Sequence, residues 1–218
     1  MKSIPLFAFT LYMILNFPMF AQDEDGQQIV IYEVPANIAV NKMPWYKDVY
    51  LFSDFQAGTV VYASRRKDNE TLKLNYNLYY EKVECINKQG DTVLLKTQKL
   101  KFVTIGGTPF LFDNVKGFIE IVGDAPVALG VKTFMVGNFG NDLRTSPSAY
   151  DRRYIKNVSY FFIDRRTSVH KAIKPSILKL FAPYAEKINE YLETNPVDFN
   201  RQEDLIRLLN FCHSLRHT

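Results

Sequence analysis

The side chains of this chain that could bind a metal or transfer a proton begin with its three histidines, His170, His213 and His217. His213 and His217 are four residues apart, which places them on one face of a helix at the spacing of two zinc ligands. No acidic residue completes the set at helical spacing, and the pair lies at the C-terminus. We therefore interpret it as an exposed terminal turn rather than a metal site.

A hydrolase needs a nucleophile with a positioned base, or two carboxylates that meet across a cleft. Ser146 and Ser148 lack the Gly-x-Ser-x-Gly sequence of a nucleophile elbow, and nothing in the sequence orients His170 toward them. Three aspartates in expected loops could pair only through the fold: Asp124, Asp142 and Asp151. Surface turns explain these aspartates more simply, so we assign no catalytic residue.

Oxygen ligands for calcium are the third possibility. Asn138, Asn141 and Asp142 are close together, and Asp23-Glu24-Asp25-Gly26 is a second acidic run. Neither has the spacing of a 12-residue calcium loop, and both patterns indicate solvated turns. We therefore assign no metal-binding or cofactor-binding residue and expect no cofactor.

Three arginine pairs occur in expected loops or at strand ends: Arg65-Arg66, Arg152-Arg153 and Arg165-Arg166. If the fold brings them together, they form a basic patch that suits an anionic surface or lipid. The formal net charge of the whole chain is only +4, which is too slight to indicate nucleic acid binding.

The chain has two cysteines, Cys85 and Cys212, each among apolar neighbours. In an oxidising compartment they could form a disulfide. Their surroundings favour two separate buried thiols, and the sequence leaves the pairing open.

The first 21 residues have the order of a secretory signal peptide: a basic start, an apolar stretch, a small residue and then an acidic run. The apolar stretch contains Pro5 and Pro18 and lacks a basic flank, which argues against an uncleaved membrane anchor. We expect cleavage after Ala21 and a mature chain in the periplasm or cell envelope. No further stretch is long and apolar enough to span a membrane as a helix.

Residues 49–166 have the pattern of an antiparallel β domain. Short runs rich in Val, Ile, Phe and Tyr recur between Gly, Asn and charged turns. From Leu72 to Tyr80 apolar residues alternate with Lys73, Asn75 and Asn77, which predicts a strand with one buried and one solvated face. The fold class that we expect is mainly β, an antiparallel meander sandwich or a small barrel, and the closure of the sheet stays open.

Two segments border or interrupt this domain. Residues 22–48 form an N-terminal segment that leads into it, with strand composition interrupted by Pro35 and Pro44. Residues 137–157 are polar and show no periodicity, which predicts a long loop within the β domain. Loops of this length in compact domains are usually functional or mobile.

Residues 167–218 are predicted to form two to three short C-terminal helices. Two apolar stripes occur there at helical spacing: Tyr184, Ile188, Tyr191 and Leu192, and then Leu205, Leu208, Leu209 and Cys212. Asn200 and Glu203 have the spacing of a capping box, with Asn in place of Ser or Thr. We expect the apolar stripes to pack against each other and against one flank of the sheet.

Several segments resemble exported, β-rich proteins of Bacteroidota that have no assigned function. The segment Phe20-Ala21-Gln22 is similar to signal peptide ends of that phylum. The other matching segments are Gly58-Thr59-Val60, Leu74-Asn75-Tyr76-Asn77, Gly90-Asp91-Thr92, Gly137-Asn138-Phe139-Gly140, Leu178-Lys179-Leu180-Phe181 and Asp204-Leu205-Ile206-Arg207-Leu208-Leu209. The resemblance implies a location in the cell envelope and transfers no site residue.

Taken together, these patterns favour a non-catalytic interaction or structural module that binds a protein partner in the envelope. Two alternatives stay open. The 17 Phe and 13 Tyr residues are compatible with a β domain that holds a small apolar or lipid ligand. An unrecognised hydrolase would require Asp124, Asp142 and Asp151 to converge in a cleft.

Overall fold

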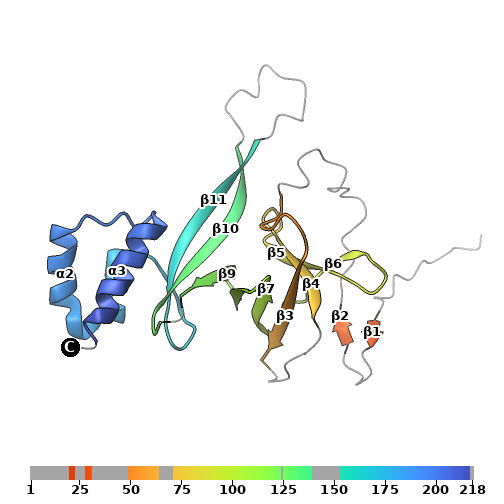
Figure 1. The fold of residues 1–218 in the computed structure, drawn as a ribbon, viewed down its shortest axis with the longest axis horizontal. Helices are drawn as coiled ribbons and strands as arrows, with labels where there is room; N and C mark the ends of the chain where they lie inside the picture. The colour runs from red at the N-terminus through yellow and green to blue at the C-terminus, as the bar shows by residue number, and fades with distance from the viewer. Residues whose placement is uncertain are drawn as a thin grey trace, which may run out of the picture.

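The computed structural model describes residues 20–22, 28–30, 49–63, 71–123, 125–138 and 153–216. Within these residues, ten strands form one antiparallel sheet, and three α-helices follow it (Figure 1). The prediction of a mainly β chain with short C-terminal helices is confirmed. None of the helices in this part of the chain is both long and apolar enough to cross a membrane.

The strands of the large sheet are, in chain order, β3 (Gln56–Tyr62), β4 (Leu72–Asn77), β5 (Lys82–Ile86), β6 (Thr92–Leu94), β7 (Leu100–Ile105), β8 (Thr108–Asp113), β9 (Gly117–Val122), β10 (Ala128–Asn138), β11 (Arg153–Ile163) and β12 (Val169–Lys171). The helical elements are α1 (Lys174–Leu180), the 3-10 helix η3 (Ala182–Tyr184), α2 (Ala185–Thr194) and α3 (Gln202–Ser214). A separate antiparallel pair joins β1 (Phe20–Gln22) to β2 (Gln28–Val30).

The large sheet is open, with the strand order β12-β11-β10-β9-β8-β7-β3-β4-β5-β6. The sheet curls strongly, because Tyr76 of β4 lies 5.9 Å from Phe118 of β9, measured between ring centroids, although three strands separate them in the sheet. The β domain, expected to be a sandwich or a small barrel, is therefore a single open sheet that curls.

Two side-by-side contacts hold the curled sheet in this shape. β10 pairs with β9 only as far as Val131. Beyond that point the Met135 amide donates to the Leu78 carbonyl at 3.0 Å, and Lys132 Nζ lies 2.5 Å from Glu81 Oε2. The turn between β4 and β5 thus contacts the edge of β10 at the point where β9 no longer pairs with it.

The apolar residues form two main cores. The first lines the inner face of the curled strands, where the rings of Tyr76, Phe110 and Phe118 contact one another. The second lies between the β10–β11 hairpin and the helices, and it includes Phe162, Ile188 and Leu208. Figure 1 shows the hairpin between the helices on one side and the curled strands on the other.

The helical stripes predicted from the sequence all face the second core, so this prediction is confirmed. The predicted capping box is wrong, because α3 begins after Arg201 and has no side-chain cap, while the Asn200 amide instead lies against Asp198. α1 begins with Pro175 in its first turn, where the missing amide has no consequence.

The segment 137–157, predicted as a long loop, is strand at both of its ends. β10 continues to Asn138 and β11 begins at Arg153, because the two strands pair in an unbroken register along their whole length. The segment Ile155 to Ser159 mixes polar and apolar residues without clear alternation, since its first four side chains are exposed and Ser159 is only half-buried.

The solvated face predicted for β4 is also different. Lys73 is exposed as expected, but Asn75 and Asn77 are both buried. The Asn75 side chain donates to the carbonyls of Phe52 and Asp54 and accepts the Phe52 amide, so it holds the segment that precedes β3 against β4. A buried amide is tolerated here because its hydrogen bonds are made by backbone groups.

Candidate functional site

Most of the loop residues weighed as site candidates lie outside the described residues: Ser146, Ser148, Asp124, Asp142, Asp151, Asn141, His217, Arg65, Arg66, Arg152 and the 23–26 run. Asn138 lies at the end of β10. In the described parts of the chain, no three His, Cys, Asp or Glu side chains gather closely enough to hold a metal ion. Whether the aspartates converge, as the hydrolase alternative requires, stays a prediction.

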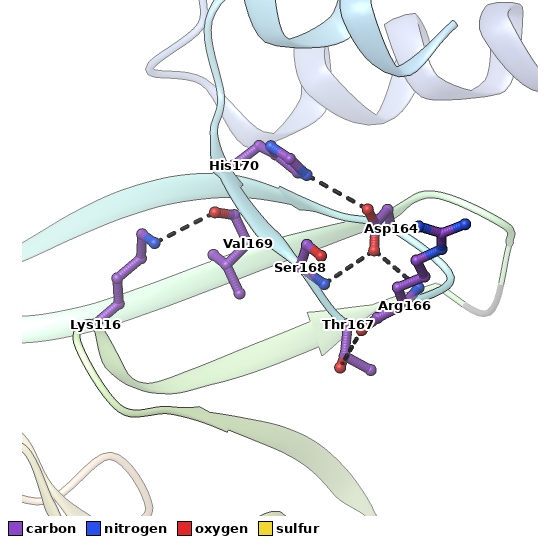
Figure 2. Close-up of polar contacts among 7 residues, drawn as sticks. All are labelled: Lys116, Asp164, Arg166, Thr167, Ser168, Val169 and His170. Carbon is purple, nitrogen blue, oxygen red and sulfur yellow. Dashed lines mark hydrogen bonds and ion pairs between the residues drawn. The ribbon is translucent and has the colours of Figure 1, made fainter.

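His170 is one candidate that the structure places clearly. It lies in β12, and its Nε2 is 3.5 Å from Asp164 Oδ2 (Figure 2). Asp164 Oδ1 accepts the backbone amides of Arg166 and Ser168, at 2.8 and 2.9 Å. The aspartate therefore closes the turn between β11 and β12, and the histidine braces this turn from the following strand.

The charge of Asp164 is stabilised by the turn itself. Burial is the largest influence on its pKa and acts upward, but the amides of Ser168 and Arg166 together with His170 outweigh it and lower the pKa. An ionised carboxylate that accepts several backbone amides is the usual anchor of such a turn. This geometry accounts for the Asp–His pair without a catalytic role.

The surroundings of this turn are basic. Arg165 and Arg166 are exposed, and Lys116 from the β8–β9 turn donates to the Val169 carbonyl at 3.3 Å (Figure 2). Of the three arginine pairs, only this one has described side chains. A convergence of all three pairs on one anionic surface therefore stays a prediction.

The other described histidine, His213, belongs to the second core. Its ring centroid lies 5.7 Å from that of Phe181, and the Arg216 guanidinium covers the same phenylalanine at 4.5 Å. His213 thus packs from α3 against the turn after α1. His217, the other member of the predicted metal-ligand pair, lies outside the described residues.

The two cysteines are free and lie in different cores, which confirms the interpretation of separate buried thiols. Burial raises the pKa of Cys85 to about 11 and that of Cys212 to about 12. Both thiols are therefore protonated at neutral pH and poorly reactive.

A buried carboxyl group that sequence reasoning missed lies in β5. Glu84 is 2% exposed, its Oε2 accepts the Tyr50 hydroxyl at 2.5 Å, and its Oε1 accepts the Asn77 amide at 2.8 Å. Asn77 Oδ1 in turn accepts the amides of Tyr79 and Tyr80. The group joins three segments of the β domain and is closed to solvent, which makes it structural.

We expect the Glu84 carboxyl to make stability depend on pH. Burial raises its pKa, and the hydrogen bonds from Tyr50 and Asn77 only partly oppose this. A raised folded-state pKa means that the contribution of Glu84 to stability is complete below the unfolded pKa and is lost as pH rises through the folded value. Glu84→Gln should therefore become more stable relative to wild type as pH rises.

Urea denaturation at several values between about pH 4 and about pH 8 measures this difference. Glu190→Gln, on the exposed side of α2, is the matched control and should stay within about 0.5 kcal/mol of wild type throughout. A Glu84→Gln difference that is constant with pH would show that this carboxyl does not titrate in the range.

The outer edge of β11 is unpaired over most of its length in the part of the chain that the structure describes. β10 and β11 are both 11 residues long, but β9 pairs with only three residues of β10 and β12 with only three of β11. We call the part of the hairpin beyond these contacts, residues 132–138 and 153–159, the ribbon. It extends away from the body of the sheet (Figure 1).

The ribbon exposes apolar side chains as well as backbone. Val136 and Ile155 are directly opposite each other in the register, and they are 43% and 53% exposed. Val158, on the other face of β11, is 40% exposed. Large exposed apolar residues on a projecting hairpin are typical of a contact surface.

Comparison with known proteins adds no assignment: no protein-family model, no curated protein and no solved structure matches this chain.

Proposed function

We propose that the protein is an exported, non-catalytic module of the cell envelope that binds a protein partner through the ribbon. The observation that carries this proposal is the ribbon itself, which two packed cores hold out from the sheet with exposed apolar residues on both faces. The signal-like leader of the sequence supports export.

The titratable groups of the described residues support a binding role rather than catalysis. The Asp164–His170 pair closes a turn, and Glu84 is almost completely buried. Both are explained by the positions they hold in the fold. The exposure of Val136, Ile155 and Val158 has no such explanation within the described chain, where Met135 of the ribbon packs against the first core but these three side chains remain exposed.

Affinity purification of a C-terminally tagged copy from its native envelope, after crosslinking, tests the proposal. We expect a stoichiometric protein partner with the wild-type chain, and recovery at least about tenfold lower with the double variant Val136→Ser, Ile155→Ser. The control is Val115→Ser, an even more exposed apolar residue in the β8–β9 turn, which should recover as much partner as wild type.

Two results would contradict the proposal. A clean preparation without a partner would remove the reason to regard the chain as an interaction module. Equal recovery by the ribbon variant and the control would place the contact surface elsewhere.

A further inference from the structure

We infer that the free edge of β11 accepts an extended, acidic segment of the partner protein as an added β-strand. This inference rests on the proposed function and names the way in which the ribbon would bind. It depends on the direction of the backbone groups along β11, on the shortness of the other edge strands that the structure describes, and on the charge around the free edge.

Along β11, the amide and carbonyl groups of every second residue point to the edge opposite β10. The Ala172 amide donates to the Tyr160 carbonyl at 3.0 Å, so the backbone groups of Tyr160 face outward. By the alternation of an antiparallel strand, those of Val158 and Lys156 face outward too. Among the described residues, no strand pairs with them, since β12 covers only Phe161 to Ile163.

Asn157 partly occupies this edge. Its Oδ1 accepts the Val158 amide at 2.8 Å, which leaves the Lys156 amide and the carbonyls of Lys156 and Val158 as the outward groups without a described partner. A side chain that caps an edge amide, next to a lysine, is a usual protection against indiscriminate strand pairing. An incoming strand can replace the single hydrogen bond from the Val158 amide to Asn157 Oδ1 with a backbone hydrogen bond, so its displacement costs little free energy.

The other edges of the sheet are less suitable. β6 and β12 are only three residues long. The edge of β10 beyond its pairing with β9 is already in contact with the β4–β5 turn, where the Met135 amide donates to the Leu78 carbonyl. The free part of β11, residues 153–159, is about 23 Å long at the usual rise of a strand. Strand addition needs a continuous free edge of this kind.

The charge along the free edge of β11 indicates which charge the incoming segment should have. The described charges along this edge are positive: Lys156 is exposed on the free part of β11, and Lys171 of β12, opposite Phe161, is exposed just beyond it. A second copy would bring the same positive charges to the pairing and is therefore disfavoured. An acidic segment complements them.

The side chains define the pattern of that segment. Lys156 and Val158 share one face of β11, while Ile155 and the opposite Val136 lie on the other. A segment that alternates acidic and apolar residues would place carboxylates beside Lys156 and apolar side chains beside Ile155.

An octapeptide of alternating Glu and Val is the probe for this inference. At millimolar concentration it should slow hydrogen exchange of the Lys156 amide in the full chain by at least about tenfold. An octapeptide of alternating Lys and Val should have no effect. Val158→Pro removes an outward amide and leaves the β10–β11 hydrogen bonds intact, so it should abolish the protection.

Val158→Thr keeps the amide and should retain the protection, and Lys156→Glu keeps the backbone but should lose binding of the acidic probe. Unchanged exchange of the Phe162 amide confirms that each variant is folded. The inference is wrong if the acidic probe gives no protection, or if Val158→Pro binds it as wild type does.

The same variants separate this inference from the proposed function. If the partner is recovered from the envelope equally well by Val158→Pro, Val158→Thr and wild type, strand addition is wrong while the interaction module stands. If no bait recovers a partner, the proposed function itself falls.

Discussion

Phe162→Ala is expected to lower the free energy of unfolding by about 3–5 kcal/mol. The Phe162 ring is fully buried in the second core, where β11 meets Ile177, Phe181 and Leu208 of the helical tail. Its removal leaves a cavity at the contact between the sheet and the helices. Because this contact also supports the base of the ribbon, the variant should loosen the helices and the hairpin together.

Chemical denaturation measures this loss, and Val158→Ala is its control. Val158 lies on the same face of the same strand but is exposed, so its truncation should lower stability by less than about 1 kcal/mol. Equal losses for the two variants would mean that the helices do not pack on β11 as described.

Gly58→Ala is expected to lower stability by about 3 kcal/mol or more, or to prevent folding. A Cβ atom at this position would lie 2.1 Å from the Thr104 carbonyl oxygen of β7 and 2.8 Å from Leu74 Cδ1. The oxygen belongs to the backbone of the adjacent strand, so relief requires β3 and β7 to separate at the centre of the sheet.

Gly130→Ala is the matched control, because it introduces the same methyl group into a strand. Its nearest neighbours would be Ile119 Cγ2 at 2.8 Å and Ile163 Cδ1 at 3.0 Å, which are side-chain atoms and yield more readily than the backbone of a neighbouring strand. We expect a smaller loss for this variant, of about 1–2 kcal/mol. Thermal or urea unfolding distinguishes the two, and a Gly130→Ala loss as large as that of Gly58→Ala would contradict the close approach of β3 to β7.

The fold class was predictable because the periodicity of this chain is strong where the structure is half-buried. The alternation around Leu74 and Tyr76 identifies β4, and the stripe from Leu205 to Cys212 identifies α3. The patterns could not show which segment of the chain packs against each face of a strand. Asn75 and Asn77 have the composition of a solvated face, yet segment 49–54 and Glu84 cover them, and that contact is not local.

The ends of β10 and β11 escaped prediction for a related reason. The β11 strand of the ribbon has no buried face at residues 155–158 and so no hydrophobic alternation to reveal it, and Lys156 and Asn157 have the composition of a loop. The pairing of the two strands, and not the sequence of either one, makes this segment extended.

The candidate site was predictable only in fragments. The sequence identified His170 and the Arg165-Arg166 pair as unusual residues, but not that Asp164 joins His170 to the turn. The free edge of β11 depends on the length of β12, its neighbour in the sheet, which no local pattern contains.

The most direct test of the ribbon as a partner surface is photo-crosslinking from a single position in the native envelope. A photoreactive phenylalanine analogue at position 155, on the ribbon, should give one strong crosslinked species with a protein partner. The same analogue in place of Glu190, on the exposed side of α2, should give none. Absence of a crosslink from position 155, or an equal one from position 190, would contradict the assignment of the ribbon as the binding surface.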